Sequence, residues 1–275
     1  MQQKAMKYFL FCFSFIFQIA YCNADDIKAT LYNQKTDKGY HILVDNDEYC
    51  PVSLQIDFEL KNLTSTQGNK RVFVVPAKSK GFVITDLVYI KKASYSYNLQ
   101  SVLNYGDVTL TKYDDYDYSL PFSKGEKFEI FQGYNGIFSH QGENALDFLM
   151  PIGTNVMAMR DGIVVKVVDI NNQNCPEKRC GEFNNYILIY HSDGTFSKYV
   201  HLKYRGAKVK EGDVVKENEL IGYSGNTGWS SGPHLHIMIY LQKIDMPETI
   251  KTKFKINDGV ESRILNEKDV CYKNY

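Results

Sequence analysis

Residues 231–240 read SGPHLHIMIY and place two histidines two positions apart at the start of an apolar run. The Gly-Pro pair before the histidines is typical of a turn, and the apolar run after them is typical of a strand. Side chains at positions i and i+2 of a strand point to the same face of the sheet. We therefore expect His234 and His236 to face one cavity and Leu235 to point the other way. Taken alone, such a pair more often lies on an exposed surface, so other segments have to decide its role.

Residues 139–148, SHQGENALDF, carry a histidine and an aspartate seven positions apart. Asp147 lies between two apolar residues, and a charged carboxylate is costly to bury unless it is paired or binds a metal. His140, Asp147 and one histidine of the pair would supply the three ligands of a catalytic zinc ion, with water in the fourth position. Zinc accepts this mixture of nitrogen and oxygen ligands, whereas magnesium and calcium prefer more oxygens.

Residues 198–202, KYVHL, end a further strand-like segment with His201. A zinc-bound water that attacks a carbonyl group needs a base to accept its proton and a donor to stabilise the oxyanion. The sequence contains no H-E-x-x-H motif that would supply a glutamate base. His201 and the second histidine of the pair at 234 and 236 are therefore candidates for these two roles. A closed structural zinc site, in which His201 or His234 is a fourth ligand, is an alternative.

The order and spacing of these segments resemble those of the lysostaphin/LytM-type zinc metallopeptidases, which cut peptidoglycan cross-bridges. The resemblance covers about residues 131–240. The matching segments, in chain order, are HQGENALD at 140–147, MPIGTNV at 150–156, AMRDGIV at 158–164, YVHL at 199–202, VKEGDVV at 209–215, IGYSGNTG at 221–228 and GPHLH at 232–236.

The resemblance implies that zinc is held by His140, Asp147 and His236, and that His201 and His234 flank the metal-bound water and the oxyanion. Which of these two histidines is the base is left open. The implied function is that of an exported zinc-dependent endopeptidase, which hydrolyses stem peptides or cross-bridges of bacterial peptidoglycan. The alternative is a non-catalytic protein of the same fold that binds the cell wall or activates another hydrolase. Such proteins usually lack metal ligands, and none is missing here.

The sequence departs from the family pattern in two places. The gap between His140 and Asp147 is longer than usual, so residues 141–146 are expected to bulge or loop. Residues 174–182 form an apparent insertion with two cysteines. We interpret His191 as structural, and Trp229 either stacks on substrate at the groove rim or anchors its loop.

The composition predicts an all-β protein with a substantial core. Hydrophobic residues make up 44% of the chain and aromatic residues 14%, with many Tyr, Phe, Val and Ile residues, which favour strands. Short alternating segments predict a β-sandwich-like domain over residues 25–125. An antiparallel β metallopeptidase domain should follow over residues 126–245, and a C-terminal strand or tail over residues 246–275. The formal net charge of zero argues against nucleic acid as a partner; the oligomeric state is left open.

The N-terminus resembles a signal peptide over residues 1–24, with cleavage near Ala24. Its apolar run is shorter than the roughly 20 residues of a membrane-spanning helix, so we expect export without a transmembrane span. A lipoprotein anchor at Cys22 is a minor alternative. In an oxidising compartment the four later cysteines favour disulfides. A disulfide between Cys175 and Cys180 would close a short loop, and residues 50 and 271 are the remaining pair or stay free.

Overall fold

A computed structural model describes residues 27–275, so the expected signal peptide and Cys22 lie outside the described part of the chain. Strands dominate this part, and its one helix is the short 3₁₀ segment η1 (Lys178–Phe183). The prediction of an all-β protein is therefore confirmed. The chain divides into two compact units, which we call unit 1 (up to residue 109) and unit 2 (residues 110–275). Within residues 27–275 no helix combines the length and apolarity needed to cross a membrane.

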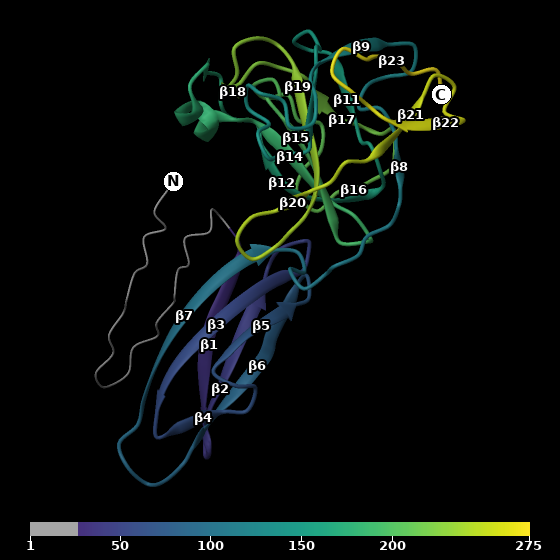
Figure 1. The fold of residues 1–275 in the computed structure, drawn as a ribbon. Helices are drawn as coiled ribbons and strands as arrows, with labels where there is room; N and C mark the ends of the chain where they lie inside the picture. Colours follow the sequence, from purple (N-terminus) through teal and green to yellow (C-terminus); the bar gives the residue numbers. More distant parts are fainter. Residues whose placement is uncertain (1–26) are drawn as a thin grey trace. The chain divides into compact units, whose positions relative to one another are not determined.

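Unit 1 consists of two antiparallel sheets with the strand orders β1-β2-β6-β4 and β5-β3-β7 (Figure 1). Both sheets contribute to one buried cluster, for example Ile42 and Leu87 from the first sheet and Leu54 and Leu103 from the second. This is the expected sandwich. Its strands are β1 (Ala29–Thr36), β2 (Gly39–Asn46), β3 (Val52–Lys61), β4 (Leu63–Ser65), β5 (Lys70–Val75), β6 (Ser79–Tyr89) and β7 (Ser96–Tyr105).

Unit 2 is organised around a nine-stranded sheet with the order β16-β12-β14-β15-β19-β10-β9-β23, in which β20 also pairs with β19. Smaller sheets pair β11 with β17, β13 with β18, and β22 with β21 and β8. The elements other than η1 are β8 (Asp117–Tyr118), β9 (Lys127–Gln132), β10 (Ala145–Phe148), β11 (Asn155–Met157), β12 (Gly162–Val168), β13 (Asn174–Cys175), β14 (Tyr186–Tyr190), β15 (Thr195–Val200), β16 (Val214–Val215), β17 (Leu220–Tyr223), β18 (Gly228–Trp229), β19 (Leu235–Leu241), β20 (Glu248–Thr249), β21 (Lys253–Ile256), β22 (Glu261–Ile264) and β23 (Val270–Tyr272).

The strand β19 lies between β15 and β10 inside this sheet, and its register sets the positions of the candidate site. His236 pairs with Asp147 of β10 on one side and with Val200 of β15 on the other. Residues directly opposite each other in an antiparallel pair point to the same face. The apolar chain neighbours of Asp147 and His236, Leu146 and Ile237, point to the other face and join the buried core of unit 2.

The structural division between the units differs from the domain boundary expected after residue 125. Leu120 and Phe122 are fully buried in the core of unit 2, and β8 pairs with β21. Residues 246–275 also belong to unit 2, where β23 forms an edge of the large sheet beside β9. Sequence patterning alone does not separate these short strands from those of unit 1, because both regions alternate with the same period.

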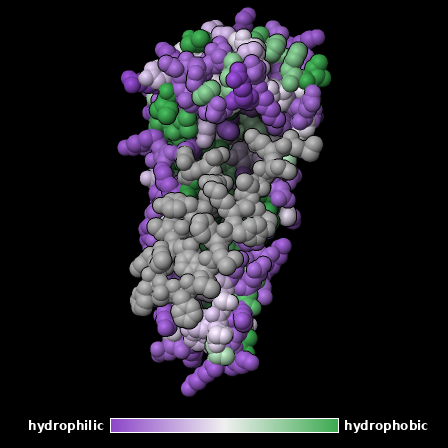
Figure 2. Space-filling view, turned by 90° about the vertical axis from the view of Figure 1, so that its left-hand side faces the viewer, coloured by the Kyte–Doolittle hydropathy of each residue, from purple (hydrophilic) through white to green (hydrophobic). Residues whose placement is uncertain are grey.

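The disulfide predicted between Cys175 and Cys180 is present. Cys50 and Cys271, whose pairing the sequence left open, are free and buried. Burial raises the pKa of each of these two thiols to about 12. In Figure 2 the visible surface of unit 2 is mostly hydrophilic, and its hydrophobic residues gather in small groups.

Candidate metal centre

Three side chains from separate segments converge in unit 2. Asp147 of β10 and His236 of β19 face each other across one rung of the sheet, and His140 comes from the loop before β10. His236 Nδ1 lies 2.9 Å from Asp147 Oδ1, and His140 Nε2 lies 3.3 Å from Asp147 Oδ2. The two histidine nitrogens are 3.2 Å apart. Among residues 27–275 these three form one group whose possible ligand atoms all lie within 4.8 Å of one another.

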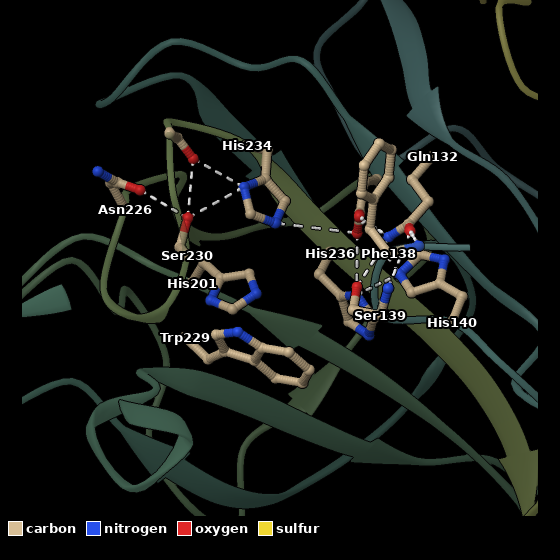
Figure 3. A network of polar contacts seen from close by, with 12 residues as sticks. Gln132, Phe138, Ser139, His140, His201, Asn226, Trp229, Ser230, His234 and His236 are labelled. Atoms are coloured by element: carbon tan, nitrogen blue, oxygen red, sulfur yellow. Dashed lines mark hydrogen bonds and ion pairs between the residues drawn. The ribbon is translucent and has the colours of Figure 1, made fainter. Parts of the chain in front are cut away.

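A second layer of contacts orients these ligands. His140 Nδ1 donates to the carbonyl oxygen of Gly133 at 2.9 Å, so its Nε2 is directed into the group and has a lone pair for a metal ion when the ring is neutral. Gln132 Nε2 donates to Asp147 Oδ2 at 2.9 Å. The oxygen of the same amide, Gln132 Oε1, accepts the backbone N–H groups of Phe138 and Ser139 (Figure 3). One glutamine thus ties the loop that precedes His140 to the aspartate.

Gln132 is a site residue that sequence reasoning missed. It lies at the end of β9, directly beside Asp147 in the sheet. A glutamine in a short alternating segment gives no signal of its own, because such residues are usually exposed. Here it is 2% exposed and all its polar atoms are bonded, which a buried amide requires.

The long gap between His140 and Asp147 is accommodated as expected. The chain turns after His140, where the N–H of Glu143 donates to the His140 carbonyl oxygen at 2.9 Å. Strand β10 begins only at Ala145, and the pairing of β10 with β9 shifts register between Asp147 and Phe148. The loop therefore absorbs the additional residues without moving the aspartate from its rung.

Asp147 is ionised in this environment although it is only 4% exposed. Burial opposes ionisation, but hydrogen bonds from His140 and His236 and the charge of nearby histidines hold the pKa of Asp147 well below its usual range. Burial also opposes the protonation of His140, while the hydrogen bond to Asp147 raises the pKa of that histidine. The residues thus form a cation-seeking site around a buried carboxylate.

The donor set fits a zinc ion. It offers two imidazole nitrogens and a carboxylate, which are zinc ligands in catalytic sites, and the possible ligand atoms all lie within 4.8 Å of one another. Of the pair at 234 and 236, the structure brings His236 into the group. His234 Nε2 is 3.9 Å from Asp147 Oδ1 and lies outside the group of three. Within the described residues no fourth protein ligand completes a closed site.

His201 and His234 lie beside this group and next to each other. Their ring centroids are 4.5 Å apart, and the centroid of His201 is 5.9 Å from that of His236. His201 Nδ1 donates to the Thr227 carbonyl oxygen, and His234 Nδ1 donates to the Gly232 carbonyl oxygen, both at 2.8 Å. Each imidazole therefore keeps its Nε2 free for chemistry.

Burial affects the protonation of both histidines. It lowers the pKa of His201 to about 3, with the charges of His234 and His236 contributing in the same direction. Burial also lowers the pKa of His234. Both rings are therefore neutral at pH 7 in this environment, which is the form in which a free Nε2 accepts a proton.

A backbone feature directs His201 to this face. Alternation along β15 would point His201 away from the face that carries Val200 and His236. The residue instead has φ of 63°, in the left-handed region that non-glycine residues rarely adopt. The following residue, Leu202, is bonded through its N–H to the Asn185 carbonyl oxygen and through its carbonyl oxygen to Thr227 Oγ1. These contacts hold a conformation of the kind often found at functional sites.

The insertion lies beside the loop that orients these histidines. Strand β13 of the insertion pairs with β18, and Trp229 Nε1 donates to the carbonyl oxygen of Pro176 at 3.0 Å. Residues on either side of β18, Thr227 and Ser230, contact His201 and His234. The geometry supports the interpretation of Trp229 as an anchor of its loop.

His191 stands apart from the group. It is fully buried, and its Nδ1 donates to the Asp161 carbonyl oxygen while its Nε2 bonds to Ser197 Oγ. Burial lowers its pKa to about 4. With both nitrogens occupied by structural partners, His191 has the structural role that we expected.

Comparison with known proteins finds matches in the second half of the chain. Residues 141–246 match the family described as Peptidase family M23, and this range includes Asp147, His201, His234 and His236. An uncharacterized metalloprotease of Buchnera aphidicola is 29% identical over 84% of this chain and 63% of its own length. The peptidoglycan DD-endopeptidase ShyA of Vibrio cholerae is 41% identical over 34% of this chain and 19% of its own length.

The catalytic domain of lysostaphin from Staphylococcus simulans is 29% identical in sequence, over 45% of this chain and 87% of that domain, with a TM-score of 0.34. The chain covers less than two thirds of the length of the two relatives described above. The expected resemblance to lysostaphin-type peptidases is confirmed for the second half of the chain by the family match and by lysostaphin of Staphylococcus simulans, which is 41% identical over 33% of this chain and 16% of its own length.

Proposed function

Starting from the peptidase family M23 domain of residues 141–246, we propose that this protein is a zinc-dependent endopeptidase that cleaves peptide bonds in bacterial peptidoglycan. The observation that carries the proposal is the convergence of His140, Asp147 and His236 around a point where their ligand atoms meet. The name of the relative ShyA, a peptidoglycan DD-endopeptidase, supports the substrate class.

A bound zinc ion would supply a Lewis acid that polarises a carbonyl group and lowers the pKa of water. His140, Asp147 and His236 would hold the ion. His201 and His234 lie on the adjacent side, and each offers a free Nε2. One of these nitrogens would accept the proton of the attacking water, and the other ring, after taking up a proton from solvent, would donate a hydrogen bond to the oxyanion. Loop carbonyl oxygens orient His201 and His234 in the same way, so each histidine is suited to be the base or the hydrogen-bond donor.

The alternative function is wall binding or activation of another hydrolase without catalysis. The complete set of five candidate side chains favours catalysis, since a binding protein has no need for two oriented histidines, one buried and one half-buried, that each retain a free nitrogen. The two functions differ in one observable, the release of cleaved peptides.

We also propose that the protein is exported and works in the periplasm or outside the cell. The signal-like segment at residues 1–24 supports export, and the disulfide between Cys175 and Cys180 is compatible with an oxidising compartment. Cell fractionation combined with N-terminal sequencing of the mature protein tests this. A new N-terminus close to residue 25 in the exported fraction is expected, and full-length protein in the cytoplasm would contradict export.

The catalytic proposal is tested with purified protein and defined cell walls. Elemental analysis should find about one zinc ion per chain, and mass spectrometry should detect muropeptides cut at a peptide bond. Removal of the metal with a chelator should stop the cleavage, and added zinc should restore it. Zinc binding without any released peptide would favour the non-catalytic alternative, whereas cleavage that survives complete metal removal would contradict the proposed chemistry.

A further inference from the structure

Lys198 lies on the same face of the large sheet as the candidate metal centre. It belongs to β15 and pairs with Met238 of β19, while Val200, two positions later, pairs with His236. Because the side-chain period of a strand is two, Lys198 and Val200 share one face, and their partners Met238 and His236 lie on that face too. Two positions along a strand span about 7 Å. Lys198 therefore lies within one or two peptide residues of the catalytic group.

The ammonium group of Lys198 has an aromatic contact but no anion. Its Nζ lies 4.6 Å from the ring centroid of Tyr186, the residue opposite Val200 on β14. Across residues 27–275, no hydrogen-bond acceptor or carboxylate contacts this Nζ within bonding distance. Burial lowers the pKa of Lys198, and the more distant charge of Glu143 opposes that effect. The ammonium group of Lys198 is thus partly shielded from solvent and has no protein counter-ion.

The fully buried cations Arg160 and Lys273 of unit 2 are paired, whereas Lys198 is half-buried. Arg160, 4% exposed, donates to Asp193 at 2.7 Å. Lys273, 1% exposed, donates through Nζ to a backbone carbonyl oxygen at 2.8 Å and to an asparagine side-chain oxygen at 2.6 Å. Buried charges are normally satisfied in this way, because an unpaired one costs free energy. The half-buried Lys198 has no such partner within residues 27–275, and it lies on the face of the sheet that carries the candidate metal centre.

We propose that Lys198 is a specificity-determining residue that binds a carboxylate of the peptide substrate next to the bond that is cleaved. This inference rests on the proposed endopeptidase function. Peptides of the bacterial wall carry carboxylates on side chains and at their ends, so either group has the required chemistry. A charge-assisted hydrogen bond to the ammonium group would replace the missing counter-ion, and the ring of Tyr186 would hold the lysine in place.

The test uses three synthetic peptides with one sequence, taken from the peptide part of a muropeptide of the defined cell walls. The first has free carboxylates, the second is amidated at its C-terminus, and the third is amidated on the side chain beside the cleaved bond. Wild-type protein should hydrolyse one amidated peptide with a kcat/KM about tenfold or more below that of the first. The amidated peptide that is affected identifies which carboxylate binds.

The variants Lys198→Met, Lys198→Arg and Lys208→Met separate recognition from structure. Lys198→Met should abolish the discrimination mainly through a higher KM, and Lys198→Arg should retain it. Lys208 is a matched control, because its exposed ammonium group also lies over a tyrosine ring, that of Tyr223 at 5.0 Å. Lys208→Met should behave as wild type. Zinc content and thermal unfolding of all variants report on folding.

Two results would overturn the role of Lys198. In the first, the Lys198→Met variant still hydrolyses the peptide with free carboxylates faster than the amidated peptides. In the second, Lys198→Met lowers the hydrolysis of all three peptides by the same factor relative to wild type. Binding of the three peptides to the His201→Ala variant with and without the additional change Lys198→Met, measured by calorimetry, gives a readout without turnover. If wild-type protein cleaves nothing, the proposed function fails, yet this binding measurement still decides whether Lys198 selects carboxylates.

Discussion

The two faces of the large sheet in unit 2 come from the same strands but carry different side chains. On one face Leu146, Tyr199 and Ile237 are at most 1% exposed and belong to the apolar core. On the other face, their neighbours Asp147 and His236 form the candidate metal centre. Alternation along each strand separates the residues that stabilise the fold from those that perform chemistry, although they are adjacent in sequence.

The two faces also differ in the hydrogen-bond partners of their polar side chains. On the core face the Tyr199 hydroxyl accepts the Met159 N–H, and no catalytic group takes part in this contact. On the site face His140, His201 and His234 are oriented by carbonyl oxygens of loops rather than by the sheet. The sheet therefore fixes where the residues stand, and the loops determine which nitrogen faces the reaction.

The largest expected effect comes from Asp147→Ala on the site face. Without the carboxylate the site loses its anionic ligand, so both bound zinc and hydrolysis should fall below detection. The loss should exceed the roughly 10- to 100-fold effects typical of residues that only support metal ligands. Elemental analysis and muropeptide release measure it, with the exposed residue Asp245 changed to alanine as control. Retained turnover in Asp147→Ala would refute the site.

His201→Ala should separate metal binding from catalysis on the same face. His201 lies outside the group of three ligands, so the variant should keep its zinc while kcat falls by about 10²- to 10⁴-fold, as for loss of an acid–base group. His41→Ala, in unit 1, is the control. A parallel loss of zinc would instead point to a closed site in which His201 is a ligand.

Ile237→Ala tests the core face one position away from His236. Truncation of this buried side chain should lower the free energy of unfolding by about 2–5 kcal/mol. Protein that remains folded should bind zinc in the same ratio as wild type, because Ile237 points away from the metal centre. Denaturant unfolding measures the change. Val260→Ala, at an 84% exposed position, should stay within about 0.5 kcal/mol. If Ile237→Ala and Val260→Ala had the same free energy of unfolding, the core face would not have the stabilising role assigned to it.

Gln132→Ala should have a smaller effect, confined to metal affinity. The variant removes the donor to Asp147 and the acceptor for the loop before His140, so zinc affinity should fall about 10- to 100-fold. Competition with a chromogenic chelator measures this affinity. Gln173→Ala, which changes an exposed side chain, should leave it unaltered. Unchanged affinity in Gln132→Ala would show that the ligands keep their orientation without this amide.

The smallest effect is expected from the paired change Cys175→Ser and Cys180→Ser. Loss of this short loop closure should lower the stability of the oxidised protein by about 2 kcal/mol. Because β13 pairs with β18, a modest fall in kcat should accompany it. Thermal unfolding and kinetics should show the same changes in reduced wild-type protein. A reductant that also altered the double variant would assign the effect to another group.

Several site residues could be predicted because each segment carries a local signal, whereas the choice of His236 as the ligand came from the resemblance to the peptidase family. The strand period placed His234 and His236 near one face, and an aspartate among apolar residues marked a buried carboxylate that needs a partner. The disulfide between Cys175 and Cys180 followed from short spacing. The division between the units was less accessible, since it depends on which distant strands β8 and β23 join.

The sequence by itself determined the all-β character and the short disulfide, because these depend on periodicity and on residues close together in the chain. The candidate ligands came from local signals together with the resemblance to the peptidase family. Only the tertiary structure decided that Gln132 reaches Asp147, that a positive φ turns His201 toward the site, and that Lys198 stands there without an anion. Each of these depends on strand register and on loop carbonyl oxygens that meet across long sequence separations. The local sequence pattern carries no information about these long-range contacts, because they form only when the whole sheet has assembled on its packed core.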